Sequence, residues 1–153
     1  MAVYFKVGNL LDAPVDYICH QVNCQGRMGS GIAKQIRERW PAVYDFYITR
    51  LDMLKDKALG HTQLVPINNG KVIINMFAQQ YYGYDGKQYT SYDAFWACLG
   101  GICDSVPKGS KIGFPAKIGC GLGGANWEVI CKMIMEVLDK DYEVYIYMLE
   151  EEM

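Results

Sequence analysis

The feature that most constrains this chain is a glycine-rich loop between an apolar run and a helical pattern. The apolar run covers Tyr17 to Val22, the loop follows at residues 23–31 with the sequence NCQGRMGSG, and a helical pattern opens at Ile32. A strand that passes through glycines into a helix leaves free backbone amides and the positive end of the helix dipole beside the loop. The stretch from His20 to Gly31 therefore predicts a site for part of a phosphate-bearing small molecule.

The composition limits what the chain can bind and where it can work. Its 153 residues, 51% of them hydrophobic, suit a single domain over 1–153 with a sizeable core. The net charge of −2 gives no general attraction for nucleic acid, so an anionic ligand has to be held locally. No apolar run is long enough to cross a membrane, and the first eight residues lack a secretory signal. We expect a cytoplasmic protein with neither a membrane nor a nucleic-acid partner.

The six cysteines and two histidines form no metal-binding pattern. No Cys-x-x-Cys pair occurs, and the histidines, His20 and His61, lie far apart in the sequence. We expect no metal and no cofactor, and we expect the thiols to be reduced.

Strand patterns alternate with helical patterns along the chain. Strands are expected at 3–7, 16–22, 63–67, 71–77, 111–116 and 144–149, and helices at 32–40, 41–51, 91–106 and 126–138. The residues Asn68-Asn69-Gly70 predict a hairpin, which makes the sheet mixed. The order predicts a three-layer α/β/α fold with a mixed, mostly parallel central sheet, in which ligands lie at the carboxyl ends of strands.

A second glycine-rich loop repeats the arrangement of the first. Residues 118–124, with the sequence IGCGLGG, lie between the strand at 111–116 and a helix that Asn126 can cap. Two such loops in one small domain favour a diphosphate held between them, although tight turns also explain the glycines. Neither loop matches a P-loop or a dinucleotide-binding fingerprint, which argues against a nucleoside triphosphatase and a dinucleotide dehydrogenase.

Two polar side chains near the end of the strand before the first glycine loop are candidates for function. The Asn23 amide can bond sugar hydroxyls, or it can form an Asx turn that shapes the loop. His20 can act as a general acid or base if its ring reaches the site; otherwise it is a hydrogen-bonded core residue.

Several further side chains near the loops allow two interpretations. Cys24 and Cys120 are reactive thiols if a helix N-terminus lowers their pKa, but small residues that permit tight packing explain them more simply. Arg27 either meets a phosphate or is solvated. The tyrosines of the long exposed loop at 79–90 either cover a base or ribose or only anchor that loop; they are Tyr81, Tyr82 and Tyr84.

Taken together, these stretches resemble the macro domain, the ADP-ribose-binding fold. The similarity spans Gly8 to Leu149 and is strongest from His20 to Ala33 and from Phe114 to Trp127. Within the family, the chain is most similar to the branch of ADP-ribose 1''-phosphate phosphatases and glutamate-ADP-ribose hydrolases. The resemblance implies that ADP-ribose binds in a cleft at the strand ends.

The resemblance also implies roles for individual residues. Asn23 matches an asparagine near the distal ribose, and His20 resembles a histidine of the phosphatase-like members. Asn9 and Leu10 match the place where many members carry an aspartate that accepts from the adenine amino group, and asparagine keeps an acceptor oxygen without the charge. Contacts from the first loop are implied for Gly29, Ser30, Gly31 and Ile32. Amides for the diphosphate are implied at Gly119, Cys120, Gly121, Leu122 and Gly123.

The chain departs from the family's hydrolases at two places. Those enzymes use a lysine just after the strand that corresponds to Val72 to Phe77, and an aspartate in the second glycine loop. Here residues 77–80 read FAQQ, and Gly123 and Asn126 stand at the candidate aspartate positions. A lysine-dependent glutamate-ADP-ribose hydrolase is therefore not expected.

Three functions remain compatible with the sequence. The first hypothesis is that the chain binds ADP-ribose or a derivative and dephosphorylates ADP-ribose 1''-phosphate, with His20 and Asn23 as catalytic residues. The second is a non-catalytic reader of free ADP-ribose or of ADP-ribosylated protein. The third is deacylation of acyl-ADP-ribose by a water that the substrate phosphate activates.

Overall fold

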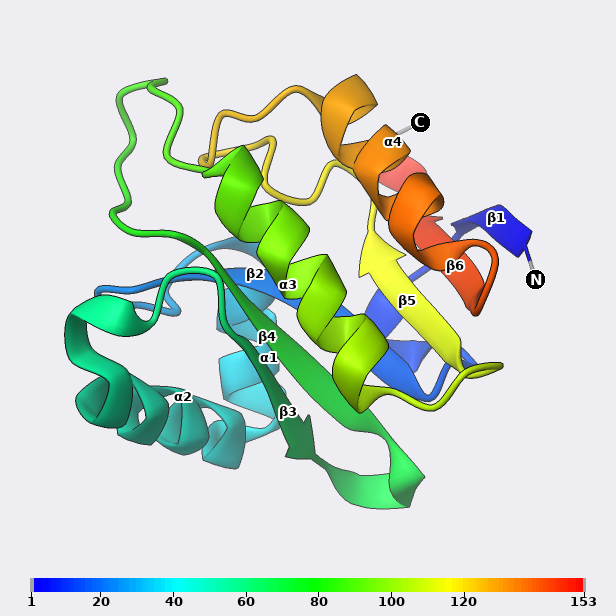
Figure 1. Cartoon of the computed structure of the whole chain (residues 1–153), viewed down its shortest axis with the longest axis horizontal. Helices are drawn as coiled ribbons and strands as arrows, with labels where there is room; N and C mark the ends of the chain where they lie inside the picture. Colours follow the sequence, from blue (N-terminus) through cyan, green and yellow to red (C-terminus); the bar gives the residue numbers. More distant parts are fainter. Residues whose placement is uncertain (1, 153) are drawn as a thin grey trace.

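Six strands form one sheet in the computed structural model, which describes residues 2–152. The strands are β1 (Ala2–Val7), β2 (Tyr17–Asn23), β3 (Thr62–Pro66), β4 (Val72–Gln79), β5 (Lys111–Pro115) and β6 (Glu143–Met148). They lie in the order β1-β6-β5-β2-β4-β3 (Figure 1). The four longer helices are α1 (Gly31–Arg39), α2 (Pro41–Leu54), α3 (Tyr92–Ser105) and α4 (Trp127–Leu138). Each expected strand and helix is present, with ends that differ by a few residues.

The sheet is mixed because one edge strand runs against the others. β3 pairs antiparallel with β4, and every other neighbouring pair is parallel. The short turn at Asn68–Gly70 joins β3 to β4, and Asn69 has a positive φ of 60° there. This confirms the predicted hairpin and the mostly parallel sheet.

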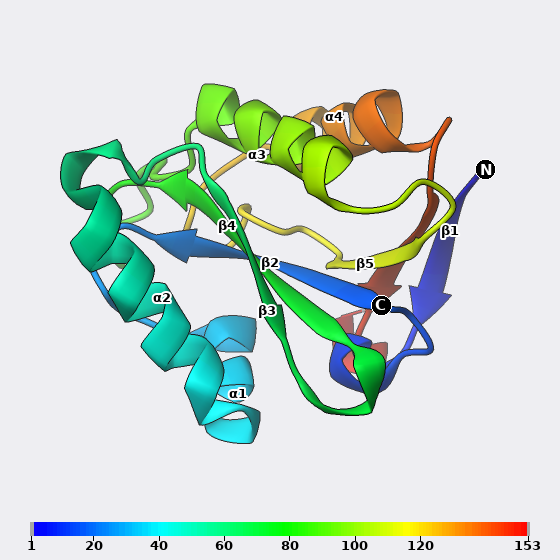
Figure 2. The ribbon, with the colours of Figure 1, turned by 60° about the horizontal axis from the view of Figure 1, so that its bottom comes forward.

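Two helices cover each face of the sheet, which makes three layers. Figure 2 shows α3 and α4 on one side of the sheet and α1 and α2 on the other. On the α1/α2 side, Ile36 and Tyr47 pack on Ile18 and Val22 of β2. On the α3/α4 side, Phe95 and Ile130 pack with Cys19 and other buried residues. β2 is therefore buried on both faces, as its apolar run indicates.

Local signals in the sequence set where the helices begin. The Ser91 side chain accepts from the amide of Ala94 at the start of α3, and Asn126 accepts from the amide of Glu128 at the start of α4. Pro41 occupies the first turn of α2. In α3, a Cβ on Gly101 would lie 2.6 Å from Thr62 Oγ1, so this glycine lets α3 pack closely on β3.

The strands β2 and β5 separate before they end. They pair only through Tyr17 with Ile112 and through Ile18 with Gly113, whereas β2 pairs with β4 along its whole length. The chain then leaves β2 for α1 on one face and leaves β5 for α4 on the other. Ligand sites in open α/β sheets lie at such a switch point, outside the carboxyl ends of the strands.

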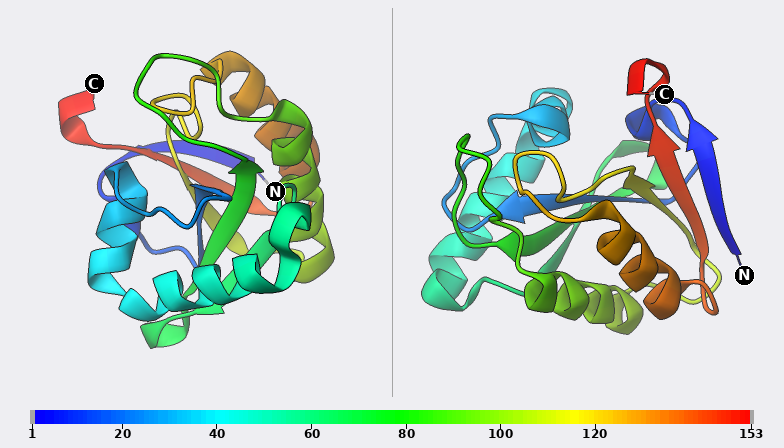
Figure 3. Two further views of the ribbon diagram at one scale, coloured as in Figure 1. Left: turned by 90° about the vertical axis from the view of Figure 1, so that its left-hand side faces the viewer. Right: turned by 90° about the horizontal axis from the view of Figure 1, so that it is seen from above.

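Three loops leave the carboxyl ends of the adjacent strands β5, β2 and β4. They are the second glycine loop, the first glycine loop and the tyrosine loop at 80–91, and Figure 3 shows them gathered at one end of the sheet. Within the described residues, no helix has the length and apolar character that a membrane span requires.

Candidate functional site

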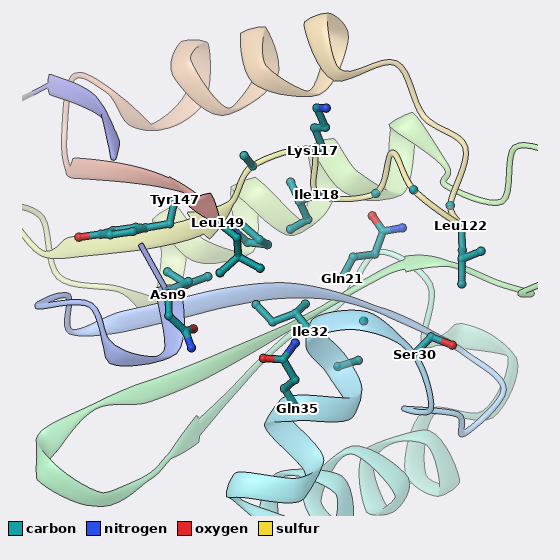
Figure 4. Close-up of a pocket in the computed structure, with 18 of the residues that line it drawn as sticks. Asn9, Gln21, Ser30, Ile32, Gln35, Lys117, Ile118, Leu122, Tyr147 and Leu149 are labelled. Atoms are coloured by element: carbon teal, nitrogen blue, oxygen red, sulfur yellow. The ribbon is translucent and has the colours of Figure 1, made fainter. Parts of the chain in front are cut away.

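A cavity of about 410 Å³ opens at the point where β2 and β5 separate. We call it the Asn9 cavity, because Asn9 and Leu10 lie at one end of it. The start of α1 forms one wall and the second glycine loop forms another, as Figure 4 shows. Tyr147 and Leu149 of the C-terminal strand region also line it. Apolar and aromatic surface at this end suits a flat ring.

A second cavity, of about 350 Å³, continues from the first. We call it the Asn23 cavity. Asn23, Arg27 and Gly29 line it from the first glycine loop, and Tyr82 and Tyr84 line it from the tyrosine loop. The residues shared by the two cavities are Gln21, Ser30, Ala33, Gln79 and Leu122. The two cavities therefore form one elongated cleft.

Backbone amides face this cleft from both glycine loops. Among residues 2–152, the amides of Gly29, Ser30, Gly31 and Ile32 have no hydrogen-bond partner, and neither do those of Gly119, Gly121, Leu122 and Gly123. The α1 N-terminus lacks a side-chain cap, so its dipole is also open to the cleft. Free amides on both sides of a narrow space are suited to an anion.

The charged side chains of the cleft have one sign. Arg27 lines the Asn23 cavity and Lys117 lines the Asn9 cavity, and both are exposed. No described residue that lines either cavity is an aspartate or a glutamate. The cleft is therefore electrostatically favourable for an anion, although the whole chain has a net charge of −2.

The glycines of the two loops serve different purposes. A Cβ on Gly123 would lie 2.5 Å from both Gly119 O and Thr90 Oγ1, so the fold itself needs glycine there. Gly29 and Gly121 have open space at the Cβ position and no positive φ. Nothing in the protein itself requires glycine at these two positions. A ligand that approaches the backbone closely would require it, because a side chain there would occupy the space of the ligand.

A polar chain that sequence reasoning missed ties the loops together under the cleft. Gln21 Nε2 donates to Gln79 Oε1 and to Thr90 Oγ1, at 2.7 Å in each case, and Thr90 Oγ1 donates to Gly119 O at 2.8 Å. Gln21 Oε1 is buried without a partner among the described residues. The available signal was the position of Gln21 and Gln79 at the carboxyl ends of inner strands, where a polar side chain is unusual.

The Asn23 side chain shapes its own loop. Its Oδ1 accepts from the amide of Gln25 at 2.9 Å and from the Tyr47 hydroxyl at 3.0 Å, and its Nδ2 donates to Arg27 O at 2.9 Å. This is the Asx-turn alternative, in which most of the amide's bonding capacity is used within the loop. Burial raises the pKa of Tyr47, so its hydroxyl stays protonated as a donor. Asn23 lines the cleft, but its carbonyl oxygen is already engaged.

His20 lies in the core and not in the cleft. It is fully buried and is absent from the residues that line both cavities. Its Nε2 bonds Asn75 Oδ1, and Asn75 in turn donates to Gln63 Oε1. Burial lowers the pKa of His20 to about 4, despite the bond to Asn75. The structure supports the alternative of a hydrogen-bonded core residue, because the bond to Asn75 holds the ring within the sheet layer.

The loop cysteines are not activated. Burial raises the pKa of both Cys24 and Cys120 to about 11, so each is a protonated thiol near neutral pH. Cys120 does not line either cavity, and its thiol donates to Ile118 O at 3.4 Å. The packing explanation fits both residues. All six cysteines are free, and no group of three described metal-binding side chains is close enough to hold an ion.

The remaining predicted residues divide between the two cavities. The Asn9 cavity contains Asn9, Leu10, Ser30, Gly31, Ile32, Gly119, Gly121, Leu122 and Gly123, and the Asn23 cavity contains Asn23, Gly29, Ser30 and Leu122. The Tyr84 hydroxyl lies 3.1 Å from Ser30 Oγ, so the tyrosine loop contacts the first glycine loop across the cleft. Tyr81 lies outside both cavities.

The sequence of this chain is similar to that of a curated protein. A DNA ADP-ribosyl glycohydrolase of Thermus aquaticus is 25% identical over 153 residues, covering 94% of this chain and 40% of that protein. The chain thus spans about two fifths of the length of that relative. No family model matches the chain.

Comparison with solved structures identifies the fold. The macrodomain of Thermus aquaticus DarG superposes with a TM-score of 0.77 at 25% identity, covering 95% of this chain and 97% of that chain. Thermosipho africanus DarTG, solved in complex with ADP-ribose, gives a TM-score of 0.79 at 20% identity, covering 97% of this chain and 42% of that chain. The sheet order, the three layers and these superpositions together show that the chain has the macrodomain fold.

Proposed function

We propose that the cleft binds ADP-ribose or a molecule that carries an ADP-ribosyl group. The diphosphate lies between the two glycine loops, the base lies at the Asn9 end, and the distal ribose lies in the Asn23 cavity. The observation that carries the proposal is the set of free amides on both loops, beside two glycines that only a ligand would require. Likeness in fold to part of Thermosipho africanus DarTG, which was solved in complex with ADP-ribose, supports it.

The shape of the cleft agrees with a ligand that has a ring at each end and anions in the middle. The Asn9 cavity offers apolar surface, the loops offer amides, and the Asn23 cavity offers amide and hydroxyl groups. The diphosphate charge meets amides and two cations without a facing carboxylate, so little electrostatic repulsion opposes binding.

Calorimetry with three nucleotides tests this proposal. ADP-ribose should bind more tightly than ADP, and ADP more tightly than AMP, because each step removes a group that the cleft contacts. If millimolar ADP-ribose produces no heat and no shift in melting temperature, the cleft does not have this function.

A second candidate function is dephosphorylation of ADP-ribose 1''-phosphate. Arg27 favours it, because a permanent cation on the Asn23 cavity can pair with a phosphate on the distal ribose. No histidine, lysine or carboxylate is among the described residues that line that cavity. Proton transfer would therefore have to involve water, the substrate itself or a hydroxyl of Tyr82 or Tyr84, which predicts slow turnover.

Phosphate release from ADP-ribose 1''-phosphate separates these functions. A phosphatase should lose most of its rate in Arg27→Gln, while His20→Ala should keep its rate per folded molecule, because His20 does not line the cleft. Tight ADP-ribose binding without release of phosphate or acyl groups would favour a reader of ADP-ribose or ADP-ribosylated protein. Release of an acyl group that is insensitive to His20→Ala would favour the deacylase.

A further inference from the structure

The base end of the Asn9 cavity is bordered by two primary amides. Asn9 precedes the short 3-10 helix Leu10–Asp12, and Gln35 lies on α1; Figure 4 shows the two side chains near each other at this end of the cavity. Both residues are exposed, so each competes with water for any partner. The inference that follows rests on the proposed function, because it concerns the base of a bound nucleotide.

The hydrogen bonds of Asn9 decide which group it offers to a ligand. Asn9 Oδ1 accepts from the amide of Leu11 at 3.0 Å. A backbone N–H can only donate, so this bond fixes which atom of the Asn9 amide is the oxygen. Among the described residues, Asn9 Nδ2 has no partner. Asn9 therefore presents a free donor to the cavity, while the turn uses one of the two lone pairs of its oxygen and leaves the other available.

A donor at this position suits a base that carries an acceptor on its edge. Adenine carries an exocyclic amino group, which needs an acceptor, whereas a 6-oxopurine carries an oxygen, which needs a donor. Among the described residues, the Gln35 amide has no protein hydrogen-bond partner that fixes its orientation, so it can present either its oxygen or its nitrogen. No carboxylate among the described lining residues favours the amino group over the oxygen.

We propose that, because of Asn9, the cleft does not distinguish adenine from hypoxanthine. It should bind the hypoxanthine analogue of ADP-ribose about as tightly as ADP-ribose itself. The ligand class is then a purine nucleoside diphosphate ribose, and the diphosphate and distal ribose supply most of the recognition. We expect the two dissociation constants to agree within about threefold, since exposed neutral hydrogen bonds discriminate weakly.

The test is calorimetry of ADP-ribose and inosine diphosphate ribose with the wild type and with Asn9→Asp. Aspartate keeps an oxygen for the amide of Leu11, so the turn is preserved, and it replaces the free donor with a charged acceptor. The variant should shift the ratio of the two affinities about tenfold toward ADP-ribose, as expected for a hydrogen bond to a charged group. Asn69→Asp adds the same charge at the exposed β3–β4 turn and should leave the ratio unchanged.

The outcomes separate this inference from the proposed function. If neither nucleotide binds, the proposed function fails. If the wild type binds both nucleotides but their dissociation constants differ by more than about threefold in either direction, the proposed function stands and the tolerance of both bases is refuted. An equal change of both affinities in Asn9→Asp would show that only the added charge matters, and would also refute the role of the Asn9 donor.

Discussion

The two glycine loops read alike in the sequence but are stabilised in different ways. The first is held by polar side chains: Asn23 bonds its own loop, and the Tyr47 hydroxyl donates to Asn23 O at 2.7 Å and accepts from the amide of Gly26 at 3.1 Å. The second is held by close packing and by backbone, because Gly123 O accepts from the amides of Tyr89 and Thr90. One loop is braced by α2, and the other by the segment before α3.

This difference shows that a glycine can be needed for folding or for binding, and that the sequence does not say which. Gly123 and Gly119 lie against protein atoms, whereas Gly29 and Gly121 lie against open space. Substituting one glycine of each group, and measuring both ligand affinity and the free energy of unfolding, therefore tests the comparison directly.

The largest expected effect is on binding, from Gly121→Glu. The side chain would enter the open space of the cleft and place a negative charge where the diphosphate is proposed to lie. We expect the affinity for ADP-ribose to fall at least about a hundredfold, or ~3 kcal/mol, with little change in the free energy of unfolding. Calorimetry and urea unfolding measure the two quantities, and retained affinity would mean that the second loop is only a turn.

The reverse pattern is expected for Gly123→Ala. Its Cβ would collide with Gly119 O and Thr90 Oγ1, so we expect the free energy of unfolding to fall by about 2 kcal/mol. The matched control, Gly121→Ala, meets no atom within 4 Å and should unfold within about 0.5 kcal/mol of the wild type. Equal destabilisation of the two variants would remove the distinction between the glycines.

The buried His20 of β2, the strand that leads into the first loop, should make the stability of the fold depend on pH. The pKa of His20 is about 4 in the folded chain and about 6.5 when unfolded, so between these values the unfolded chain binds the extra proton. The free energy of unfolding should therefore fall as the pH drops below 6.5, by about 2 kcal/mol at pH 5, and the loss should level off below pH 4. Urea unfolding at several pH values measures this, and His20→Gln should flatten the part of the profile due to this residue.

The smallest effect is expected from Tyr47→Phe. Loss of the hydroxyl leaves the amide of Gly26 and the carbonyl of Asn23 without this partner, at a cost of about 1 kcal/mol in the free energy of unfolding. The affinity gap between ADP-ribose and ADP should also narrow, because the first loop borders the cavity assigned to the distal ribose. Tyr82→Phe, which has no protein partner for its hydroxyl among the described residues, is the control for stability.

The fold could be predicted from local patterns, and the site only in outline. The apolar run of β2, the turn before β4 and the caps Ser91 and Asn126 are each encoded within a few residues, so the elements and layers followed from the sequence. The position of the two glycine loops at the cleft could be predicted as well, because each loop lies between a strand pattern and a helical pattern.

The errors concern side chains whose partners lie far away in the sequence. His20 is kept from the cleft by Asn75, and Gln21 reaches Thr90, 69 positions later. Asn9 is a different case, because its partner Leu11 lies only two residues away and the exact turn geometry brings the two together. Periodicity gives the face of a strand, but not the hydrogen bonds that decide whether a polar residue is available to a ligand.

The limited pairing of β2 with β5 has a mechanical consequence. Two three-stranded halves of the sheet, β1-β6-β5 and β2-β4-β3, share hydrogen bonds only near Tyr17 and Ile112, at the end opposite the cleft mouth. The two halves can therefore rotate about this short junction, and one glycine loop lies at the far end of each half. A diphosphate bound to both loops would connect the two halves at that end, so a bound ligand would reduce their relative motion.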